Sequence, residues 1–476
     1  MTTTTDATTA LPQPDTAPDP RPDTAPDPRR WRVLAIAAIA QYLAILDLFA
    51  VIVAFPALQQ SFGHASTGAV SWTLNAYTIV MAALLVPAGR FADDTGRKRG
   101  FLLGIALFGL ASIACGLAPN LAVLIAARVL QAAAAALLIP TGLGLVLPVF
   151  PKREHATVMG IWTAIAAAGG ASGPVIGGLL LQAGWRWIFL LNVPFTVVAF
   201  AFGLRVLPDI QQRANRRLDL LGAALILGAT AAFTTVFVQA TDWGYTAPGT
   251  LGCLVAALAL TALFVRHVRR HPDPVVSPIV LRHRLFRTAT LGVFCYYLAF
   301  AAMVLEAMLF MTEEWRYSTL RASLGVAAMP ISCLLLSPLS GRFVALVGAR
   351  ASAALGGAAI ALGCAWWVLA SGFSNSYAVV MVPGAILAGA STALLQPPLF
   401  GASTLLPADQ ISLGSGTLMM ARQTSSALGV AILTAILGDA AHRTMTEFRA
   451  GWLYMVAAGL AAMVAGLAYR PDRAAV

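Results

Sequence analysis

Long apolar runs separated by short polar stretches fill the chain from residue 33 onward. Each run has about 20 residues, the length that a helix needs to cross the hydrocarbon core of a bilayer. The pattern predicts fourteen membrane-spanning helices, which centre on residues 33–55, 68–88, 100–117, 121–147, 156–182, 187–207, 218–240, 250–267, 289–311, 322–340, 351–371, 376–397, 411–438 and 451–469. Because this number is even, we expect both ends of the chain on the same side of the membrane.

The arginine and lysine residues indicate which side that is. With the amino terminus inside, the two ends of the chain and the inner loops hold 24 of the 31 basic residues, and the outer loops hold five. Loops on the cytoplasmic side of a membrane are enriched in Arg and Lys. The distribution therefore predicts a multi-pass protein with both termini in the cytoplasm.

The two ends of the chain are polar. Residues 1–30 contain PDTAPDPR twice in tandem, and a tract so rich in Pro and Asp is typical of disorder. It has no basic start leading directly into an apolar core, as a signal peptide would. We expect a disordered cytoplasmic tail at 1–30, a second tail at 471–476, and a first spanning helix that is retained as the targeting element.

Composition supports the membrane assignment. Hydrophobic residues make up 59% of the chain, charged residues only 11%, and the mean hydropathy is +0.78. Soluble domains are about 25% charged. The net charge of +11 could indicate a nucleic-acid partner, but the basic residues are dispersed among short loops, which favours membrane topology and no nucleic acid.

Few motifs indicate an enzyme, a metal or a cofactor. The five cysteines lie inside apolar segments without paired spacing, so neither a disulfide framework nor a zinc site is predicted. His267 and His271 have a spacing that can bind a metal on a helix, but no third ligand follows, which favours a solvated basic loop. Signatures of ATP binding, dinucleotide binding and acyl transfer are missing. We expect no enzyme activity, no metal and no cofactor.

An internal repeat divides the chain in two. The segment GRFADDTGRK at 89–98 recurs in weaker form as GRFVALVGAR at 341–350, an offset of 252 residues. We expect two parallel six-helix bundles, at 31–210 and 286–470, with two extra helices and a cytoplasmic linker at 211–285. Parallel halves around a central cavity are a plan of secondary transporters. Convergence of two basic turns is the alternative explanation for these four identities.

A glycine series within the predicted fifth helix indicates close packing. Three of its glycines are four residues apart, so they share a face that lets another backbone approach, and a proline beside them predicts a bend. The face could serve a fixed helix pair or a conformational cycle. The series resembles, position by position, the antiporter motif in the fifth helix of drug exporters of the major facilitator superfamily; its residues are Gly160, Gly169, Gly173, Pro174, Gly177 and Gly178.

The loop after the second helix is similar to a second motif of that superfamily, G-x-x-x-D-x-x-G-R-K. Its glycines permit a tight turn, and its aspartate can meet an arginine or a helix N-terminus. The resemblance implies a latch between the two halves on the cytoplasmic side. Basic anchoring of the loop alone is the alternative. The matching residues are Gly89, Asp93, Gly96, Arg97 and Lys98.

Two charged residues are predicted at similar depth in the first and fourth helices. Asp47 lies fifteen residues beyond Arg32, about 22 Å along the helix. Arg128 and Gln131 resemble the superfamily's R-x-x-Q-G pattern, with Ala132 in place of glycine. A charge in the bilayer is costly unless paired, so we expect Asp47 and Arg128 to interact, for proton coupling or as a permanent structural pair.

The Asp47 segment also resembles a pattern of fourteen-helix drug:proton antiporters, L-D-x-T-x-x-N-x-A-x-P. This chain keeps Leu46, Asp47, Ala54 and Pro56 but has Phe49 and Ile52 at the two polar positions. That difference places the usual substrate or ion contacts on this helix in doubt.

Glu306 is the acid predicted inside the ninth helix. It stands among aromatic residues and methionines, where a lone carboxyl can carry a proton. Shifted by the repeat, Asp47 maps to Ala299, two turns from Glu306 on the same face, so we expect the two acids to face one cavity from opposite halves. Alternatively, Glu306 belongs with Glu313 and Glu314 in the outer loop.

The C-terminal half carries further candidates for a substrate cavity. Arg422 lies in SGTLMMARQTSSALG, which is similar to the family's A-R-Q segment, and it could pair with Glu306 or with the latch. Tyr296, Tyr297 and Phe300 could line an adaptable aromatic wall, although such stripes usually serve helix packing.

These resemblances imply an all-α integral membrane protein with the major facilitator fold, in the fourteen-helix drug:proton antiporter family. The expected function is export of lipophilic small molecules across the bacterial inner membrane by a monomer, with the proton gradient as the only energy source. Two alternatives stay open. An importer or symporter is disfavoured by the antiporter motif, and a non-transporting membrane sensor is disfavoured by the intramembrane charges.

Overall fold

A computed structural model describes most of the chain between residues 27 and 470. The described ranges are 27–63, 65–151, 154–209, 219–244, 246–272, 274–276, 278–372, 374–406, 411–438 and 443–470. They contain helices and loops and no strand, which confirms the all-α prediction for these residues. The tails expected at 1–30 and 471–476 fall almost entirely outside them.

The first bundle contains seven helical segments joined by short turns. α6 and α7 follow each other so closely that they form one crossing segment. The helices are α1 Arg30–Ser61, α2 Thr67–Thr95, α3 Arg97–Gly116, α4 Leu121–Val146, α5 His155–Leu180, α6 Arg186–Leu190 and α7 Asn192–Val206, with the 3₁₀ turn Leu147–Val149 after α4.

The rest of the chain forms a hairpin, a short connecting helix and a second bundle. The hairpin is α8 with α9, and α10 leads into the bundle. The helices are α8 Leu220–Trp243, α9 Pro248–Arg270, α10 Pro278–Arg282, α11 Arg284–Glu313, α12 Thr319–Val347, α13 Ala349–Ala370, α14 Tyr377–Gly401, α15 Ile411–Leu437 and α16 Met445–Ala468, with the 3₁₀ turn Ala402–Leu405 after α14.

The helices match the predicted spans closely. Thirteen segments of the described chain are long and apolar enough to cross a membrane, with α6 and α7 counted as one. The fourteenth long helix is α5, whose 26 residues include a shorter apolar stretch, Ala164–Leu180. At 1.5 Å per residue α5 is about 39 Å long, which is enough to span the hydrocarbon core.

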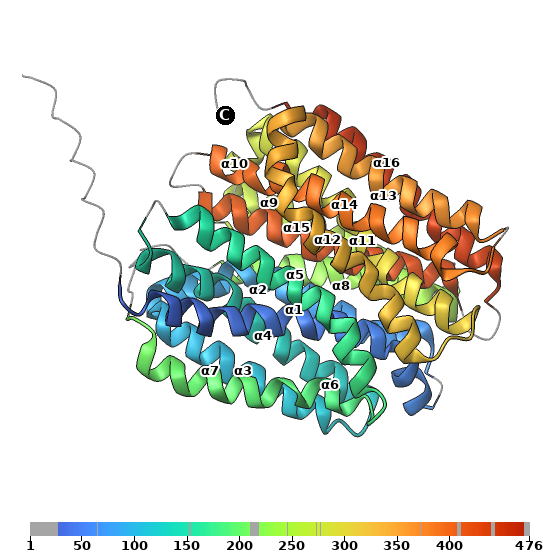
Figure 1. Ribbon diagram of the computed structural model, residues 1–476, viewed down its shortest axis with the longest axis horizontal. Helices are drawn as coiled ribbons and strands as arrows, with labels where there is room; N and C mark the ends of the chain where they lie inside the picture. The colour runs from blue at the N-terminus through green and yellow to red at the C-terminus, as the bar shows by residue number, and fades with distance from the viewer. Residues whose placement is uncertain are drawn as a thin grey trace, which may run out of the picture.

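The two bundles repeat one packing plan. In the first, α1 packs on α5, and α4 packs on both α2 and α3; in the second, α11 packs on α15, and α14 packs on both α12 and α13. These pairs correspond under the offset seen in the sequence, which supports the repeat over convergence. Figure 1 shows the blue-to-green first bundle against the yellow-to-red second bundle.

Two helix pairs join the bundles. α2 packs on α15, and α5 packs on α12. The repeat relates these two pairs by symmetry. The α8–α9 hairpin packs against α2 and α15, so it lies over one of the two seams. The extra helices therefore contact both halves without separating them.

The glycine face of α5 lies against α1. A Cβ on Gly173 would stand 2.7 Å from the Cβ of Phe49, and one on Gly177 would stand 3.1 Å from the Cα of Ala50. On another side of α5, a Cβ on Gly178 would meet Oγ of Ser323 in α12 at 2.7 Å. α5 is thus wedged between its own bundle and the other. The contacts of Gly160 lie outside the described side chains.

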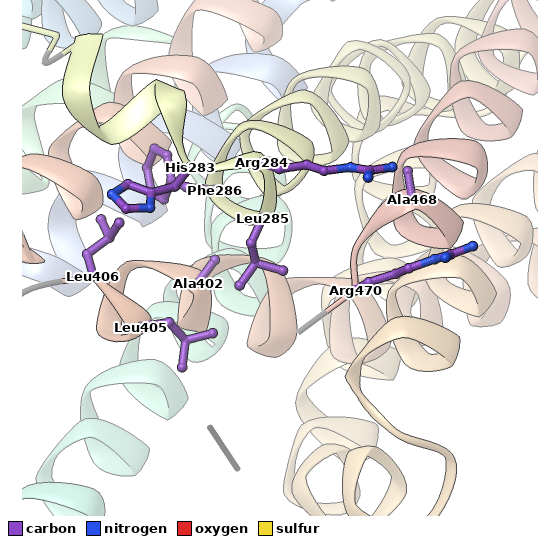
Figure 2. A pocket seen from close by; sticks show the side chains of 9 residues that line it. All are labelled: His283, Arg284, Leu285, Phe286, Ala402, Leu405, Leu406, Ala468 and Arg470. Atoms are coloured by element: carbon purple, nitrogen blue, oxygen red, sulfur yellow. The ribbon is translucent and has the colours of Figure 1, made fainter. Parts of the chain in front are cut away.

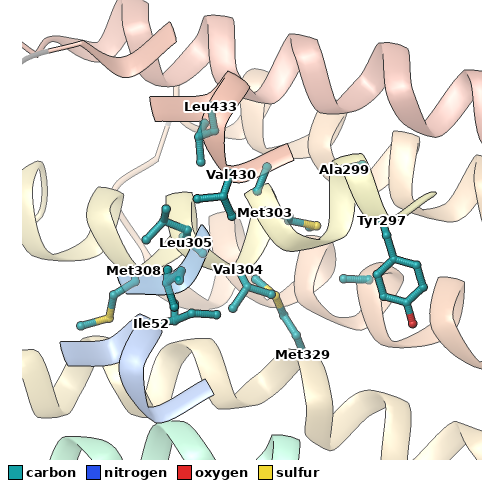
Figure 3. Packing of buried hydrophobic residues seen from close by; sticks show 14 of the residues in the cluster. Ile52, Tyr297, Ala299, Met303, Val304, Leu305, Met308, Met329, Val430 and Leu433 are labelled. Atoms are coloured by element: carbon teal, nitrogen blue, oxygen red, sulfur yellow. The ribbon is translucent and has the colours of Figure 1, made fainter. Parts of the chain in front are cut away.

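Aliphatic and methionine side chains fill the centre of the molecule where α1 meets α11. Figure 3 shows Ile52 of α1 beside Met308 and Val304 of α11, with Met329 of α12 nearby. Ile52 stands at the position of the asparagine in the L-D-x-T-x-x-N-x-A-x-P pattern that this segment resembles. The apolar substitution seen in the sequence therefore falls at the contact between the two halves.

Candidate functional site

The predicted pair of Asp47 and Arg128 forms inside the first bundle. Arg128 Nη1 donates to Asp47 Oδ2 and also to Gln131 Oε1 at 2.7 Å, and both charged side chains are fully buried. Arg128 Nε donates to the Thr73 carbonyl oxygen at 3.0 Å, and its guanidinium carbon lies 4.2 Å from the ring centre of Tyr77. The arginine is thus held by a charge, by carbonyl groups and by an aromatic face.

Two further side chains, Asn192 and Ser112, extend this network. Asp47 Oδ1 accepts from Gln131 Nε2 and Asn192 Nδ2, each at 3.0 Å. Ser112 Oγ accepts from the same two amides, at 3.0 Å from Gln131 and 3.3 Å from Asn192. The network thereby joins α1, α3, α4 and α7 around one neutralised charge pair. Of its members, the sequence predicted only Asp47, Arg128 and Gln131.

Glu306 has very different surroundings. Its side chain is fully buried in α11, seven residues before the helix ends, which rules out a place in the outer loop. Neither carboxylate oxygen has a hydrogen-bond partner among the described residues. The carboxylate lies against Gly451 of α16, where any Cβ would overlap Oε1. The absence of a side chain at Gly451 makes the space for this carboxyl group.

The structure does not bring the two acids to one cavity, so that expectation is wrong. Asp47 points toward α7 of its own bundle and Glu306 points toward α16 of its own bundle. α7 and α16 are equivalent under the repeat. Each acid thus meets a helix of its own bundle and not the other acid.

Arg422 pairs with an aromatic ring and not with Glu306. Its guanidinium carbon lies 4.9 Å from the ring centre of Tyr297. The Tyr297 hydroxyl accepts from Gln396 Nε2 at 2.5 Å, and Tyr297 packs edge-to-face on Phe300 with centroids 6.0 Å apart. The neighbouring Tyr296 hydroxyl is fixed by Ser391 and Thr392, at 3.0 and 2.6 Å. These groups combine a cation, an amide and aromatic faces between α11, α14 and α15.

The loop between α2 and α3 is fixed by contacts within the first bundle. Asp93 Oδ1 accepts from Arg97 Nε at 2.8 Å, and Arg97 Nη1 donates to the Gly144 carbonyl at 2.8 Å. Lys98 Nζ donates to the carbonyl of Leu204 in α7 at 2.9 Å. Gly96 has φ of 102°, a conformation that favours glycine. Its action as a latch between the halves stays a prediction.

A buried arginine bridges the two halves at the opposite end. Arg443, between α15 and α16, donates from Nη1 to Glu313 Oε2 at 2.5 Å and from Nη2 to Thr67 Oγ1 at 2.9 Å. Thr67 begins α2 of the first bundle and also accepts from Gln59 Nε2 at 3.2 Å. The Arg443 side chain is only 1% exposed. We call Arg443, Glu313, Thr67 and Gln59 the outer bridge, because the topology predicted from the charge bias puts this end outside.

Two cavities lie at the ends of the bundles. One, of about 730 Å³, adjoins the outer bridge and is lined by Glu314, Arg316 and Tyr317 among others. The second, of about 490 Å³, lies where α11 begins and α16 ends, and Figure 2 shows the Arg284 and Arg470 side chains on one side of it. Its lining combines basic groups with leucines.

A buried acid also fixes the start of the extra hairpin. Asp219 accepts from the backbone N–H groups of Gly222 at 2.8 Å and Val275 at 2.9 Å, and it pairs with His267 Nε2 at 2.7 Å. Burial acts to raise the pKa of the Asp219 carboxyl, but these hydrogen bonds and the histidine lower it to below its usual value. The carboxylate therefore stays ionised where it caps α8.

Comparison with known proteins identifies the family. A sequence model of the Major Facilitator Superfamily matches residues 37–281, just over half of the chain. The chain belongs to the Major Facilitator Superfamily. Membership makes it a multi-pass membrane transporter and not an enzyme.

Curated relatives place this major facilitator protein in a drug efflux family. It is 33% identical over 399 residues to Multidrug resistance protein Stp of Mycobacterium tuberculosis, an alignment that covers 83% of this chain and 74% of Stp. It is 30% identical over 450 residues to the Methylenomycin A resistance protein of Streptomyces coelicolor, covering 90% of this chain and 91% of that protein.

Solved structures agree on the fold. A crystal structure of a peptide transporter POT in complex with sulfate superposes with a TM-score of 0.68, covering 92% of this chain and 93% of that one, at 14% identity. At such low identity the likeness concerns the fold of the transporter alone.

Sequence reasoning missed several polar groups that surround the charge pair of this transporter. Asn192, Ser112 and Tyr77 are all buried and lie within apolar spans. Asn192 is an isolated amide within the otherwise aromatic and apolar segment WRWIFLLNVP at 185–194. Isolated amides and hydroxyls in spanning helices are the signal that could have identified the network.

Proposed function

We propose that this major facilitator protein exports lipophilic small molecules from the bacterial cytoplasm across the inner membrane, as a monomer, in exchange for protons. The names of its relatives support drug or antibiotic cargo. Glu306 supports proton exchange, and its buried, unpartnered carboxyl is the observation that carries the proposal.

Glu306 is the proton carrier in this scheme. An ionised carboxylate without a hydrogen-bond partner is very costly in an apolar interior, so the enclosed form of the site holds the neutral acid. When α11 and α16 move and water reaches the carboxyl, the proton can leave. Export then follows if the proton enters from outside and is released inside.

Asp47 plays a second part in the same cycle. Arg128, Gln131 and Asn192 all donate to its carboxylate, so three donors compensate its charge while the network is intact. It exchanges a proton only when α1 shifts relative to α4 and α7. Asp47 is therefore coupled to movement of the first bundle, and Glu306 to movement of the second.

The cargo contacts are expected between α11, α14 and α15. Tyr297, Phe300 and Arg422 offer aromatic faces and a cation, and Gln396 offers an amide. Such a wall suits flat lipophilic molecules with a few polar groups. Alternating access moves this wall with the second bundle while α5 slides between α1 and α12.

Replacement of Glu306 by Gln tests the scheme, because the amide keeps the shape of the carboxyl group but cannot ionise. A susceptibility panel with an overexpressing strain first identifies a transported compound. We expect E306Q to abolish accumulation of that compound driven by a proton gradient in everted vesicles, at unchanged expression. The exposed neighbour variant Glu314→Gln is the control and should transport normally. Full proton-driven accumulation by E306Q would contradict the assignment, and accumulation with the gradient reversed would indicate import.

A further inference from the structure

Three metal-binding side chains meet at the base of the extra hairpin. Asp219 precedes α8, and His267 and His271 lie at the end of α9. Their ligand atoms all lie within 4.8 Å of one another, and the two imidazole rings have centroids 5.0 Å apart. The sequence offered only the two histidines, because the third side chain comes from 48 residues earlier in the chain.

The chemistry of these groups matches a transition-metal site. Two imidazoles and one carboxylate are a usual protein ligand set for Zn²⁺, with water in the remaining position. Ligand atoms around one tetrahedral zinc ion stand about 3.3 Å apart, as metal–ligand distances of about 2.0 to 2.2 Å require. Asp219 Oδ1 and His267 Nε2 are 2.7 Å apart, and no two ligand atoms of the three side chains are more than 4.8 Å apart, so the separations bracket the spacing that one ion requires.

The surroundings also suit a cation. The C-terminus of α9, which carries partial negative charge, ends at Arg270 beside the cluster. Asp219 is almost fully buried, whereas His267 and His271 are partly exposed, so water can reach the open side. Arg266, Arg269 and Arg270 are on the same helix end but are exposed to solvent, which screens their charges.

Metal binding requires little change in the existing contacts of Asp219. The N–H groups of Gly222 and Val275 use one lone pair on each carboxylate oxygen. The contact with His267 is the one that an ion would replace, since both atoms would then turn their lone pairs to the metal. The helix cap would remain intact in the metal-bound form.

We propose that Asp219, His267 and His271 form a binding site for a divalent transition-metal ion of the zinc type. The ion would join the start of α8 to the end of α9 and to the connector at Val275. Val275 and Val276 pack with Ala82 of α2 and Met420 of α15. A bound ion would thus stiffen the segment that contacts both halves of the transporter.

Metal titration of the purified full-length protein, with an affinity tag that contains no histidine, tests the site. We expect equilibrium dialysis with Zn²⁺ to give one saturable equivalent, and Co²⁺ to give the intense visible absorption of a tetrahedral site. His271→Gln should weaken binding at least tenfold, because loss of one of three ligands exceeds the effect of a supporting group. His283→Gln, outside the cluster, is the matched control and should bind like the wild type.

Asp219→Asn provides a second ligand variant, with helical content measured in parallel by circular dichroism. Weakened binding in both ligand variants, at normal helical content, supports the site. The proposal is overturned if the wild type shows no saturable binding, or if H271Q and D219N bind as tightly as H283Q. Neither result depends on whether the protein exports drugs.

Discussion

At the scale of single residues, the two buried acids differ in their hydrogen-bond partners. Asp47 accepts hydrogen bonds from Arg128, Gln131 and Asn192, whereas Glu306 accepts none from the described residues. The first arrangement stabilises a charge, and the second favours a neutral acid. The first half thus holds a compensated charge pair, and the second half holds an unpartnered acid about two turns beyond the position equivalent to Asp47.

The Asp47–Arg128 pair can be tested by a double-mutant cycle. Asp47→Asn and Arg128→Met should each lower the free energy of unfolding in detergent by about 3–5 kcal/mol, because each leaves one buried charge unpaired. The double variant should lose less than the sum, since no uncompensated charge remains. Denaturation monitored by circular dichroism measures all three.

Glu154→Gln is a suitable control for that cycle. Glu154 meets Arg30 at 3.5 Å, and both side chains are partly exposed. An ion pair of this kind contributes at most about 1 kcal/mol, so the variant should be nearly neutral. Strictly additive losses for Asp47 and Arg128 would argue against direct coupling in the folded protein.

At the scale of helices, α5 packs closely on both bundles. Its glycines meet Phe49 and Ala50 of α1 on one side and Ser323 of α12 on another. A smooth helix surface permits such close approach and also permits sliding, because few side chains interlock. The same feature therefore serves static packing and movement.

Alanine substitution distinguishes glycines that have close neighbours from glycines with free space beside them. Gly173→Ala should be destabilising by about 1–3 kcal/mol through overpacking against Phe49 and the Leu46 carbonyl. Gly341→Ala is the matched control in α12, since a Cβ there has nothing within 4 Å. It should be neutral or stabilising, because alanine favours helix formation by about 1 kcal/mol over glycine. Thermal unfolding in detergent provides the comparison, and equal shifts would show that α5 and α1 separate readily.

At the scale of the whole molecule, the outer bridge holds the two halves together at one end. Arg443→Gln should release α2 from the segment before α16, because the shorter amide cannot reach both Glu313 and Thr67. Spin labels placed at Gln60 and Glu314, on opposite sides of the outer cavity, should then show longer distances by pulsed electron resonance. Arg449→Gln in α16 is the control, and an unchanged distance distribution in R443Q would show that other contacts close this end.

The sequence predicted the architecture better than the directions of side chains. Span length, charge bias and the repeat each combine signals from many residues. The helices and the similar depth of Asp47 and Arg128 could therefore be predicted from the sequence. The direction of Glu306 could not, because periodicity places a residue on a face but does not say which neighbour that face meets. The outer bridge was missed for a similar reason: Arg443 and Thr67 are 376 residues apart and have no common motif.

The outer bridge joins the halves by unequal contacts. Within the second half Arg443 meets the carboxylate of Glu313, but across the seam its partner among the described residues is the hydroxyl of Thr67. A hydrogen bond between a charged and a neutral group contributes about 1.5–3 kcal/mol. Since about 1.4 kcal/mol corresponds to a tenfold ratio of populations, this contact shifts the balance between closed and open outer ends by roughly one to two orders of magnitude. A carboxylate in place of Thr67 would hold this end more firmly, whereas the neutral hydroxyl would let the two halves separate here in the proposed transport cycle.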